Sequence, residues 1–153
     1  MAGFGIQLAK HIGATVITTA SANNHDYVRR LGADRVIDYR AEDFTKTVAG
    51  CDVVFDTVGG EVQLRSYAVL KPGGRLVWIA PAPEGSQPPR SDVKTLRPGV
   101  ARDRKHLERI LELLDAGAVW PPNIMRYKLT DAAEAHRVSE SRHLQGKLVF
   151  EVR

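Results

Sequence analysis

Short β-branched runs alternate with amphipathic segments along this chain, and this alternation limits the folds open to it. Residues 52–56 read Asp-Val-Val-Phe-Asp and are apolar between their ends, which is typical of a central strand buried on both faces of a parallel sheet. Residues 102–116 carry leucine and isoleucine at helical spacing. The pattern predicts an α/β fold in which helices cover a doubly wound parallel sheet.

The same patterns give expected bounds for each element. The predicted strands are residues 15–19, 35–39, 52–56, 75–80, 92–96, 125–129 and 147–152. The predicted helices are residues 5–12, 23 or 24 to 31, 42–48, 62–70, 102–116 and 130–141. Residues 81–89 hold four prolines and are expected to form a surface loop.

Composition excludes several classes of site. The 153 residues carry 22 basic and 18 acidic side chains, mixed along the chain, so nothing indicates a nucleic-acid surface. Cys51 is the only cysteine, which excludes an intrachain disulfide and a cysteine-based zinc cluster. The five histidines lack ligand spacing, so we expect no zinc. No apolar run reaches transmembrane length, and we expect a cytoplasmic protein without membrane partners.

The first ten residues read as the end of a glycine-rich nucleotide loop that runs into a helix. A dinucleotide-binding unit begins with a buried strand before this loop, and no such strand stands here. We therefore expect a Rossmann-like sheet that is missing its first strand. That strand is central, and each buried backbone group left unpaired costs about 1–3 kcal/mol. The chain should rearrange around the gap, borrow a strand from a partner, or be marginally stable.

Several motifs follow one another in a specific order. They are Gly-Phe-Gly-Ile-Gln-Leu-Ala-Lys at 3–10, Gly-Ala-Asp-Arg-Val-Ile-Asp-Tyr at 32–39, Asp-Val-Val-Phe-Asp-Thr-Val-Gly-Gly at 52–60, Leu-Lys-Pro-Gly-Gly at 70–74, Ala-Ala-Glu-Ala-His-Arg at 132–137 and Gly-Lys-Leu-Val at 146–149. Together they make the chain resemble the C-terminal part of medium-chain dehydrogenases/reductases, in the zinc-independent, quinone oxidoreductase-like branch of the zinc-type alcohol dehydrogenase superfamily.

The resemblance implies an NAD(P)-binding Rossmann domain over residues 1–153. Residues 120–153 would be a tail that in the family returns to an N-terminal GroES-like domain, which this chain lacks. The activity implied is hydride transfer from a nicotinamide cofactor to a quinone or activated alkene, and the cofactor carries that chemistry. Full-length members of the family are commonly dimers, so the resemblance also implies a homodimer. The substrate-selecting residues would belong largely to the absent domain.

Candidate cofactor residues begin at the glycine-rich segment. Gly3 would let a pyrophosphate approach the backbone, and the amides of Phe4, Gly5 and Ile6 would donate to it. The alternative is a flexible terminus that happens to contain glycine. NAD-specific sites usually place an acid after the second Rossmann strand, where this chain has Ser21. The absence of an acid at this position favours NADP(H) over NAD(H).

Other residues near this position complete the predicted site. Ser21 and Asn24 can donate hydrogen bonds to a 2′-phosphate. Arg29 and Arg30 are basic candidates there, or solvated helix residues. By resemblance, Tyr39 would contact the adenosine end, or it is an edge tyrosine that packs on the next helix.

The resemblance also assigns a nicotinamide end. Thr57, Val58 and Gly59 would lie beside the nicotinamide ribose, and Ala80 would offer backbone groups to the carboxamide. Asp56 is interpreted as bracing this turn.

Two basic residues flank the last turn. Arg142 and Lys147 could reach a phosphate, or they are ordinary surface charges. No catalytic acid, base or nucleophile is predicted from the sequence. The competing readings are a part of an oxidoreductase, a non-catalytic nucleotide-binding or assembly module, and another Rossmann protein such as a methyltransferase, against which the Gly-Ala-Asp and Asp-Thr-Val-Gly-Gly motifs argue.

Overall fold

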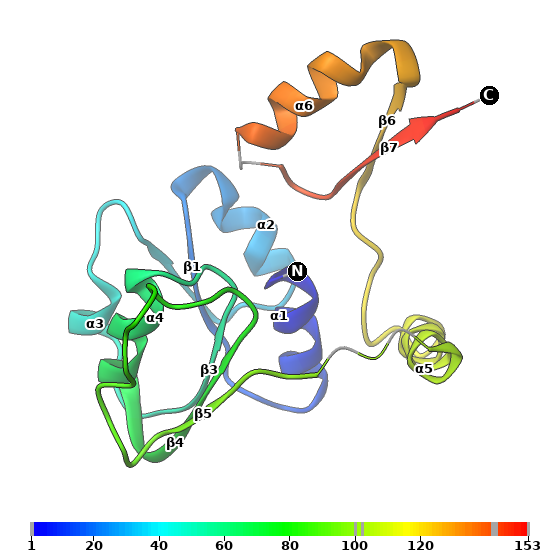
Figure 1. Cartoon of the computed structure of the whole chain (residues 1–153). Coiled ribbons are helices and arrows are strands. Elements are labelled where there is room, and N and C mark those ends of the chain that lie inside the picture. The colour runs from blue at the N-terminus through cyan, green and yellow to red at the C-terminus, as the bar shows by residue number, and fades with distance from the viewer. Residues whose placement is uncertain (1, 100, 102, 142–143, 153) are drawn as a thin grey trace.

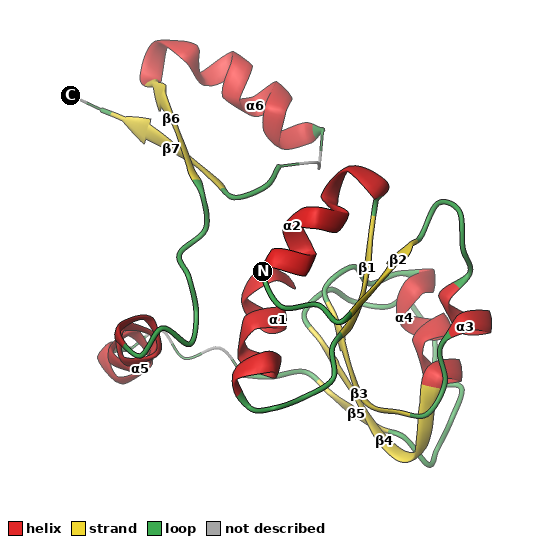
Figure 2. Cartoon of the chain, turned by 180° about the vertical axis from the view of Figure 1, so that it is seen from behind, coloured by secondary structure: helices red, strands yellow, loops and turns green. Residues whose placement is uncertain are grey.

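The computed structural model describes residues 2–99, 101, 103–141 and 144–152 of the chain, and its strands form three parallel sheets (Figure 1 and Figure 2). The strands are β1 (Ile17–Ala20), β2 (Arg35–Asp38), β3 (Cys51–Asp56), β4 (Leu70–Trp78), β5 (Lys94–Leu96), β6 (Ile124–Lys128) and β7 (Lys147–Glu151). The α-helices are α1 (Ala2–His11), α2 (His25–Arg30), α3 (Phe44–Thr47), α4 (Glu61–Ser66), α5 (Arg104–Asp115) and α6 (Ala132–Glu140). The predicted α/β fold with parallel strands is confirmed.

The strand position between β1 and β3 is vacant, so the Rossmann-like sheet is divided into two separate sheets. The observed orders are β2-β1 and β3-β4-β5, which match positions 3-2 and 4-5-6 of the doubly wound order. Within the described residues no strand occupies position 1, so β1 and β3 each pair on one edge only. Val53 and Phe55 of β3 are 44% and 45% exposed, although a central strand normally buries such residues. The structure therefore agrees with the expected sheet that lacks its first strand.

Each half of the divided sheet has its own hydrophobic core. Ile6 of α1 packs with Val16 and Ala33 beside β1 and β2. Tyr67, Leu70, Leu76 and Val93 form the second core, against β3, β4 and β5. Leu76 is fully buried, and truncating such a residue to alanine costs about 2–5 kcal/mol.

The ion-paired carboxylate of Asp34 connects three segments around the first core. Asp34 accepts hydrogen bonds from the Val16 backbone amide at 2.7 Å and from Lys10 Nζ at 2.9 Å. The amide of Val16, and then Lys10, hold the pKa of Asp34 below its usual range. This joins the end of α1, the start of β1 and the turn before β2.

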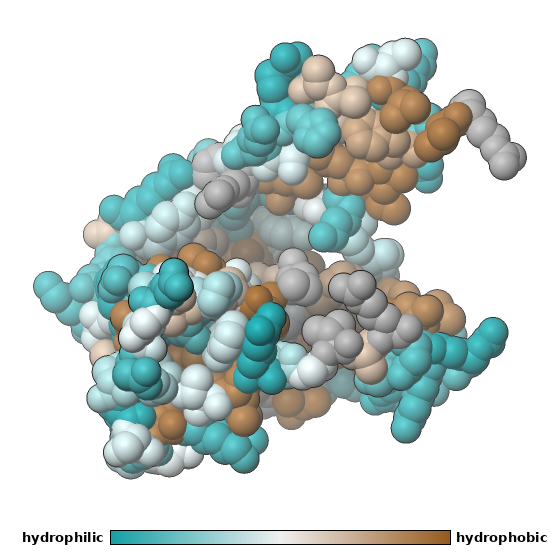
Figure 3. Space-filling model, in the orientation of Figure 1, coloured by the Kyte–Doolittle hydropathy of each residue, from teal (hydrophilic) through white to brown (hydrophobic). Residues whose placement is uncertain are grey.

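The elements β6, α6 and β7 form an arm that extends from the rest of the molecule (Figure 1). α6 covers one face of the two-stranded sheet, and Ile124 and Val149 on the other face are 53% and 39% exposed. Apolar surface of the arm borders a hollow between the arm and the remainder of the chain (Figure 3). Hydrogen bonds from Gln145 to Asn23 and Asn24 join the arm to the rest of the chain.

Several predicted boundaries are corrected, and three of them bear on the site. α1 begins at Ala2 instead of residue 5, because its first residues continue the helical backbone and form no preceding turn. β4 begins at Leu70 instead of residue 75, because Leu70 already pairs with Cys51 before the register shifts. β4 ends at Trp78, so Ala80 follows the strand and lies outside it.

Candidate nucleotide-binding site

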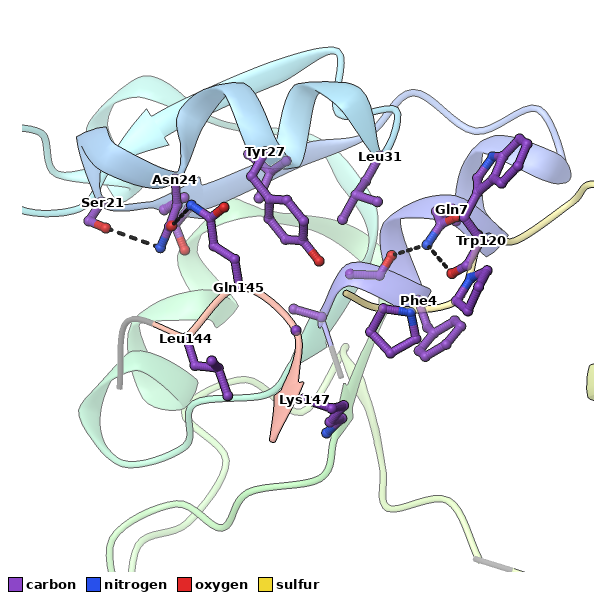
Figure 4. A pocket seen from close by; sticks show the side chains of 18 of the residues that line it. Phe4, Gln7, Ser21, Asn24, Tyr27, Leu31, Trp120, Leu144, Gln145 and Lys147 are labelled. Carbon is purple, nitrogen blue, oxygen red and sulfur yellow. Dashed lines mark hydrogen bonds between the residues drawn. The ribbon is translucent and has the colours of Figure 1, made fainter. Parts of the chain in front are cut away.

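A cavity of about 370 Å³ opens between the start of α1, the end of β1, α2 and the segment Leu144–Lys147, which precedes and begins β7 (Figure 4). Trp120, Pro121 and Pro122 close another side. The cavity gathers five of the sequence-predicted cofactor residues from three separate parts of the chain: Gly3, Phe4, Ser21, Asn24 and Tyr39. The carboxyl end of a parallel strand is where ligands bind in open α/β sheets.

The N-terminus of α1 supplies backbone donors at this cavity. Because α1 begins at Ala2, the amides without an intrahelical acceptor include those of Ala2, Gly3 and Phe4. The expectation that the amides of Gly5 and Ile6 also donate to a ligand does not fit this helix start, because amides beyond the first three helical residues donate to the carbonyl four residues earlier. Gly3 and Phe4 line the cavity, where the positive end of the helix dipole favours an anion.

Both glycines of α1 are sites of close packing. A Cβ on Gly3 would lie 3.0 Å from Leu31 Cδ1, so this glycine lets α1 approach the end of α2. A Cβ on Gly5 would lie 3.1 Å from a ring carbon of Phe55, so Gly5 lets the helix approach β3. Gly5 does not line the cavity, and its role in the structure is close helix–strand packing, as for the last glycine of the dinucleotide fingerprint.

A chain of hydrogen bonds crosses the cavity at the end of β1 (Figure 4). Ser21 is 4% exposed, and its Oγ accepts from Asn24 Nδ2 at 3.3 Å. Asn24 Oδ1 in turn accepts from Gln145 Nε2 at 2.6 Å. The Ser21 oxygen already accepts, so its own hydrogen can be donated to another group. The end of β1 thus presents hydroxyl and amide donors.

The charge of the cavity is positive and comes from one side chain. Among the described lining residues, Lys147 alone carries a charge, and none is an aspartate or glutamate. Arg29 and Arg30 do not line the cavity, and Arg29 pairs with Asp26 on the exposed surface. Arg142 lies outside the described residues. A cavity of this kind favours an anionic ligand.

The second group of predicted residues lies apart from this cavity, at the turn after β3. Asp56 is 4% exposed and accepts from the backbone amides of Val58 at 2.9 Å and Gly59 at 3.1 Å, which confirms its bracing role. A Cβ on Gly59 would lie 3.0 Å from the Cβ of Ala80, so the turn touches the segment that follows β4.

Thr57, Val58, Gly59 and Ala80 therefore form a separate group, and Val58 is 65% exposed. The structure brings the predicted residues together as two clusters at the carboxyl ends of parallel strands.

Sequence reasoning missed two residues of the site. Gln145 bonds Asn24 across 121 residues of sequence, and Gln7, which is 7% exposed, bonds Trp120 across 113 residues. Gln7 stands in the motif at residues 3–10, where no role was assigned to it, and Gln145 directly precedes the motif at residues 146–149. For Gln7, the one sequence signal of a tertiary contact is that this polar residue lies on the apolar side of α1.

Comparison with known proteins gives consistent results. A family model described as zinc-binding dehydrogenase matches residues 31–150. A chloroplastic NADPH-dependent alkenal/one oxidoreductase of Arabidopsis thaliana is 33% identical over 94% of this chain and 36% of that protein. The quinone oxidoreductase of Coxiella burnetii is 34% identical, with a TM-score of 0.84 over 98% of this chain and 49% of that one.

A third relative has a solved complex with NADPH. The Escherichia coli quinone oxidoreductase is 26% identical, with a TM-score of 0.84 over 98% of this chain and 53% of that one. The chain therefore spans about half the length, or less, of these relatives. Their similarity confirms the Rossmann-like fold and the resemblance to the C-terminal part of quinone oxidoreductase-like proteins.

The described residues offer no group of three or more His, Cys, Asp or Glu that could hold a metal ion, so they do not fit the zinc of the family's description. Each described helix is too short or too polar to cross a membrane. The motif order, the parallel sheets and the match over residues 31–150 lead to one conclusion. The chain belongs to the zinc-binding dehydrogenase family, and its relatives are quinone oxidoreductase-like medium-chain dehydrogenases/reductases.

Proposed function

We propose that this chain is the NADP(H)-binding portion of an oxidoreductase that transfers hydride to a quinone or an activated alkene. The observation that carries the proposal is the cavity at the end of β1, which presents Ser21, Asn24 and Lys147 and is lined by no described carboxylate. An acid at this point would accept from a ribose 2′-hydroxyl and repel a 2′-phosphate. Relatives named as NADPH-dependent or bound to NADPH support the same cofactor.

The two residue clusters would hold opposite ends of the cofactor. The first-turn amides of α1 at Gly3 and Phe4 would donate to a pyrophosphate, and Ser21 and Asn24 would donate to the phosphate on the adenosine ribose.

Tyr39 would contact the adenosine end. Thr57, Val58, Gly59 and the backbone at Ala80 would lie along the nicotinamide end. The bound nicotinamide supplies or accepts the hydride, while the chain's residues bind and orient it.

The remainder of the reaction would need more than the described residues. We propose that residues 1–153 are an NAD(P)-binding domain, and that residues 120–153 return to a GroES-like domain of the kind implied by the resemblance. The arm formed by β6, α6 and β7, with its uncovered face, is consistent with such a contact. A homodimer, a cytoplasmic location and the absence of nucleic-acid and membrane partners are part of the same proposal.

A non-catalytic nucleotide-binding or assembly module is the second candidate. The vacant strand position between β1 and β3 favours it, because the sheet that would support the nicotinamide end is divided there. The oxidoreductase portion and a nucleotide-binding module both require nucleotide binding and differ in turnover, whereas an assembly module requires neither.

Calorimetric titration of the folded 153-residue chain with NADPH and with NADH tests the proposal. We expect binding with a preference for NADPH, and a Ser21→Ala variant should lose part of that preference. Ser86→Ala, in the loop outside this cavity, is the matched control. Oxidation of NADPH by a small quinone would then favour the oxidoreductase over the module. The absence of binding by folded protein would contradict the oxidoreductase portion and the nucleotide-binding module, and would leave the assembly module.

A further inference from the structure

A backbone carbonyl fixes the direction of the hydrogen bonds at the end of β1. Gln145 Nε2 lies 2.6 Å from Asn24 Oδ1 and 3.4 Å from the carbonyl oxygen of Asn23. A carbonyl oxygen can only accept a hydrogen bond. Gln145 must therefore point its amide nitrogen, and not its amide oxygen, toward the 3₁₀ turn at Ala22–Asn24.

The orientation of the Gln145 amide determines the orientation of the Asn24 amide. The amide of Asn24 could present either its oxygen or its nitrogen to a neighbour, because the two ends are similar in size. Since Gln145 arrives with a donor, Asn24 must meet it with Oδ1. Asn24 Nδ2 is then turned toward Ser21, where it donates to Oγ at 3.3 Å.

The same donor-to-acceptor direction continues to the third residue of the chain of hydrogen bonds, Ser21. Ser21 Oγ accepts from Asn24, so the Ser21 hydroxyl hydrogen is directed to a further acceptor. All three side chains line the same cavity (Figure 4). Ser21 and Asn24 come from the segment that follows β1, and Gln145 comes from the segment between α6 and β7. Hydrogen bonds arranged head to tail polarise one another, which strengthens the terminal donor.

We infer that Gln145 is a positioning residue that makes this end of the cavity donor-only and so sets the preference for a ribose 2′-phosphate over a 2′-hydroxyl. A phosphate accepts several hydrogen bonds, whereas the acid of an NAD site serves as an acceptor for the hydroxyl. The inference rests on the proposed NADP(H) site and adds to it the residue that determines the direction of its hydrogen bonds.

Two nucleotides that differ only in the 2′-phosphate test this inference. Titration calorimetry of the 153-residue chain with 2′,5′-ADP and with 5′-AMP gives the ratio of the two affinities. We expect Gln145→Met, which keeps the length but removes the donor, to lower this ratio about tenfold, as for loss of a hydrogen bond to a charged group. Binding of 5′-AMP should change little.

A second variant reverses the polarity. In Gln145→Glu the carboxylate only accepts, so Asn24 should turn its Nδ2 toward residue 145 and present Oδ1 to Ser21. We expect the ratio to fall at least as far as in Gln145→Met, and the side-chain amide resonances of Asn24 should shift. Gln87→Met and Gln87→Glu make the same changes on the exposed loop outside the cavity and should leave the ratio unchanged.

The outcomes separate the two proposals. Folded wild-type protein that binds neither nucleotide would refute the NADP(H) site and this inference with it. Binding of both with an unchanged ratio in Gln145→Met would overturn the inference alone. An equal fall in both affinities would show that Gln145 only supports the arm, which also overturns it.

Discussion

Gln7 and Trp120, which lie 113 residues apart, bond to each other through both ends of one side-chain amide. Gln7 Oε1 accepts from the Trp120 backbone amide at 2.6 Å, and Nε2 lies 3.5 Å from the Trp120 carbonyl oxygen. Nε2 also donates to the Gly3 carbonyl at 3.2 Å. A buried glutamine on α1 thus fastens the segment that leads into the arm.

Gln7→Met should therefore destabilise the fold by about 0.5–1.5 kcal/mol, because it removes the side-chain hydrogen bonds to the Trp120 backbone, which water can replace only in part. Chemical denaturation monitored by tryptophan fluorescence measures the change. Gln87→Met on an exposed loop is the control and should have little effect. Equal midpoints for Gln7→Met and wild type would mean that the contact contributes nothing to stability.

Lys147→Met should weaken binding of NADPH about two- to fivefold, as expected for an exposed charge, and the loss should diminish at high salt. The reason is that Lys147 is the only charged residue among the described lining of the cavity. Lys128→Met, on the same arm but outside the lining, is the matched control. Calorimetry at two salt concentrations gives the comparison, and identical behaviour of the two variants would exclude Lys147 from the site.

Acid should weaken the fold through Asp34. The Val16 amide and Lys10 lower the pKa of this carboxyl in the folded state. Its contribution is fully present above the unfolded pKa of about 3.9 and is lost as the pH falls through the lower folded pKa. Asp34→Asn should be less stable than wild type at neutral pH and less sensitive to acid. Urea denaturation from pH 7 to pH 2 tests this, with Asp26→Asn as the exposed control; parallel pH profiles for wild type and Asp34→Asn would contradict it.

Gly59→Ala should destabilise the turn after β3 by about 1–3 kcal/mol or more, because Gly59 has a φ of 76° and its new Cβ would lie 2.5 Å from the Pro81 carbonyl oxygen. Gly85→Ala separates the two causes, since Gly85 has a φ of 74° and nothing within 4 Å of that position. The difference in unfolding free energy between the variants measures the steric part. If Gly59→Ala loses no more unfolding free energy than Gly85→Ala, the Pro81 carbonyl moves away from the new Cβ without destabilising the fold.

The chain should purify without stoichiometric zinc, and a chelator should leave its thermal unfolding midpoint unchanged. Cys51 is the sole cysteine, and the described residues include no group of potential ligands of the kind that structural zinc requires. Elemental analysis by mass spectrometry provides the measurement. One zinc per chain, removed together with loss of stability, would show that this prediction is wrong.

Local patterns in the sequence predicted the elements that depend on neighbouring residues. The apolar run at residues 52–56 became β3, and the leucine spacing over residues 102–116 became α5. The motif order also predicted the Rossmann-like fold and the vacant first strand. Five of the ten predicted cofactor residues line one cavity, because the ends of parallel strands meet at one edge of the sheet.

The amino-acid sequence by itself determined the periodicity of the strands and helices and the presence of a serine instead of an acid at position 21, since these are properties of adjacent residues. Only the tertiary structure decided that Gln145 bonds Asn24, that Gln7 bonds Trp120, and that Lys147 supplies the charge of the cavity. Gly5 likewise faces Phe55 instead of the cavity. The physical reason is that these contacts join segments up to 121 residues apart, and no local period or turn chemistry encodes where an isolated polar side chain will find its partner.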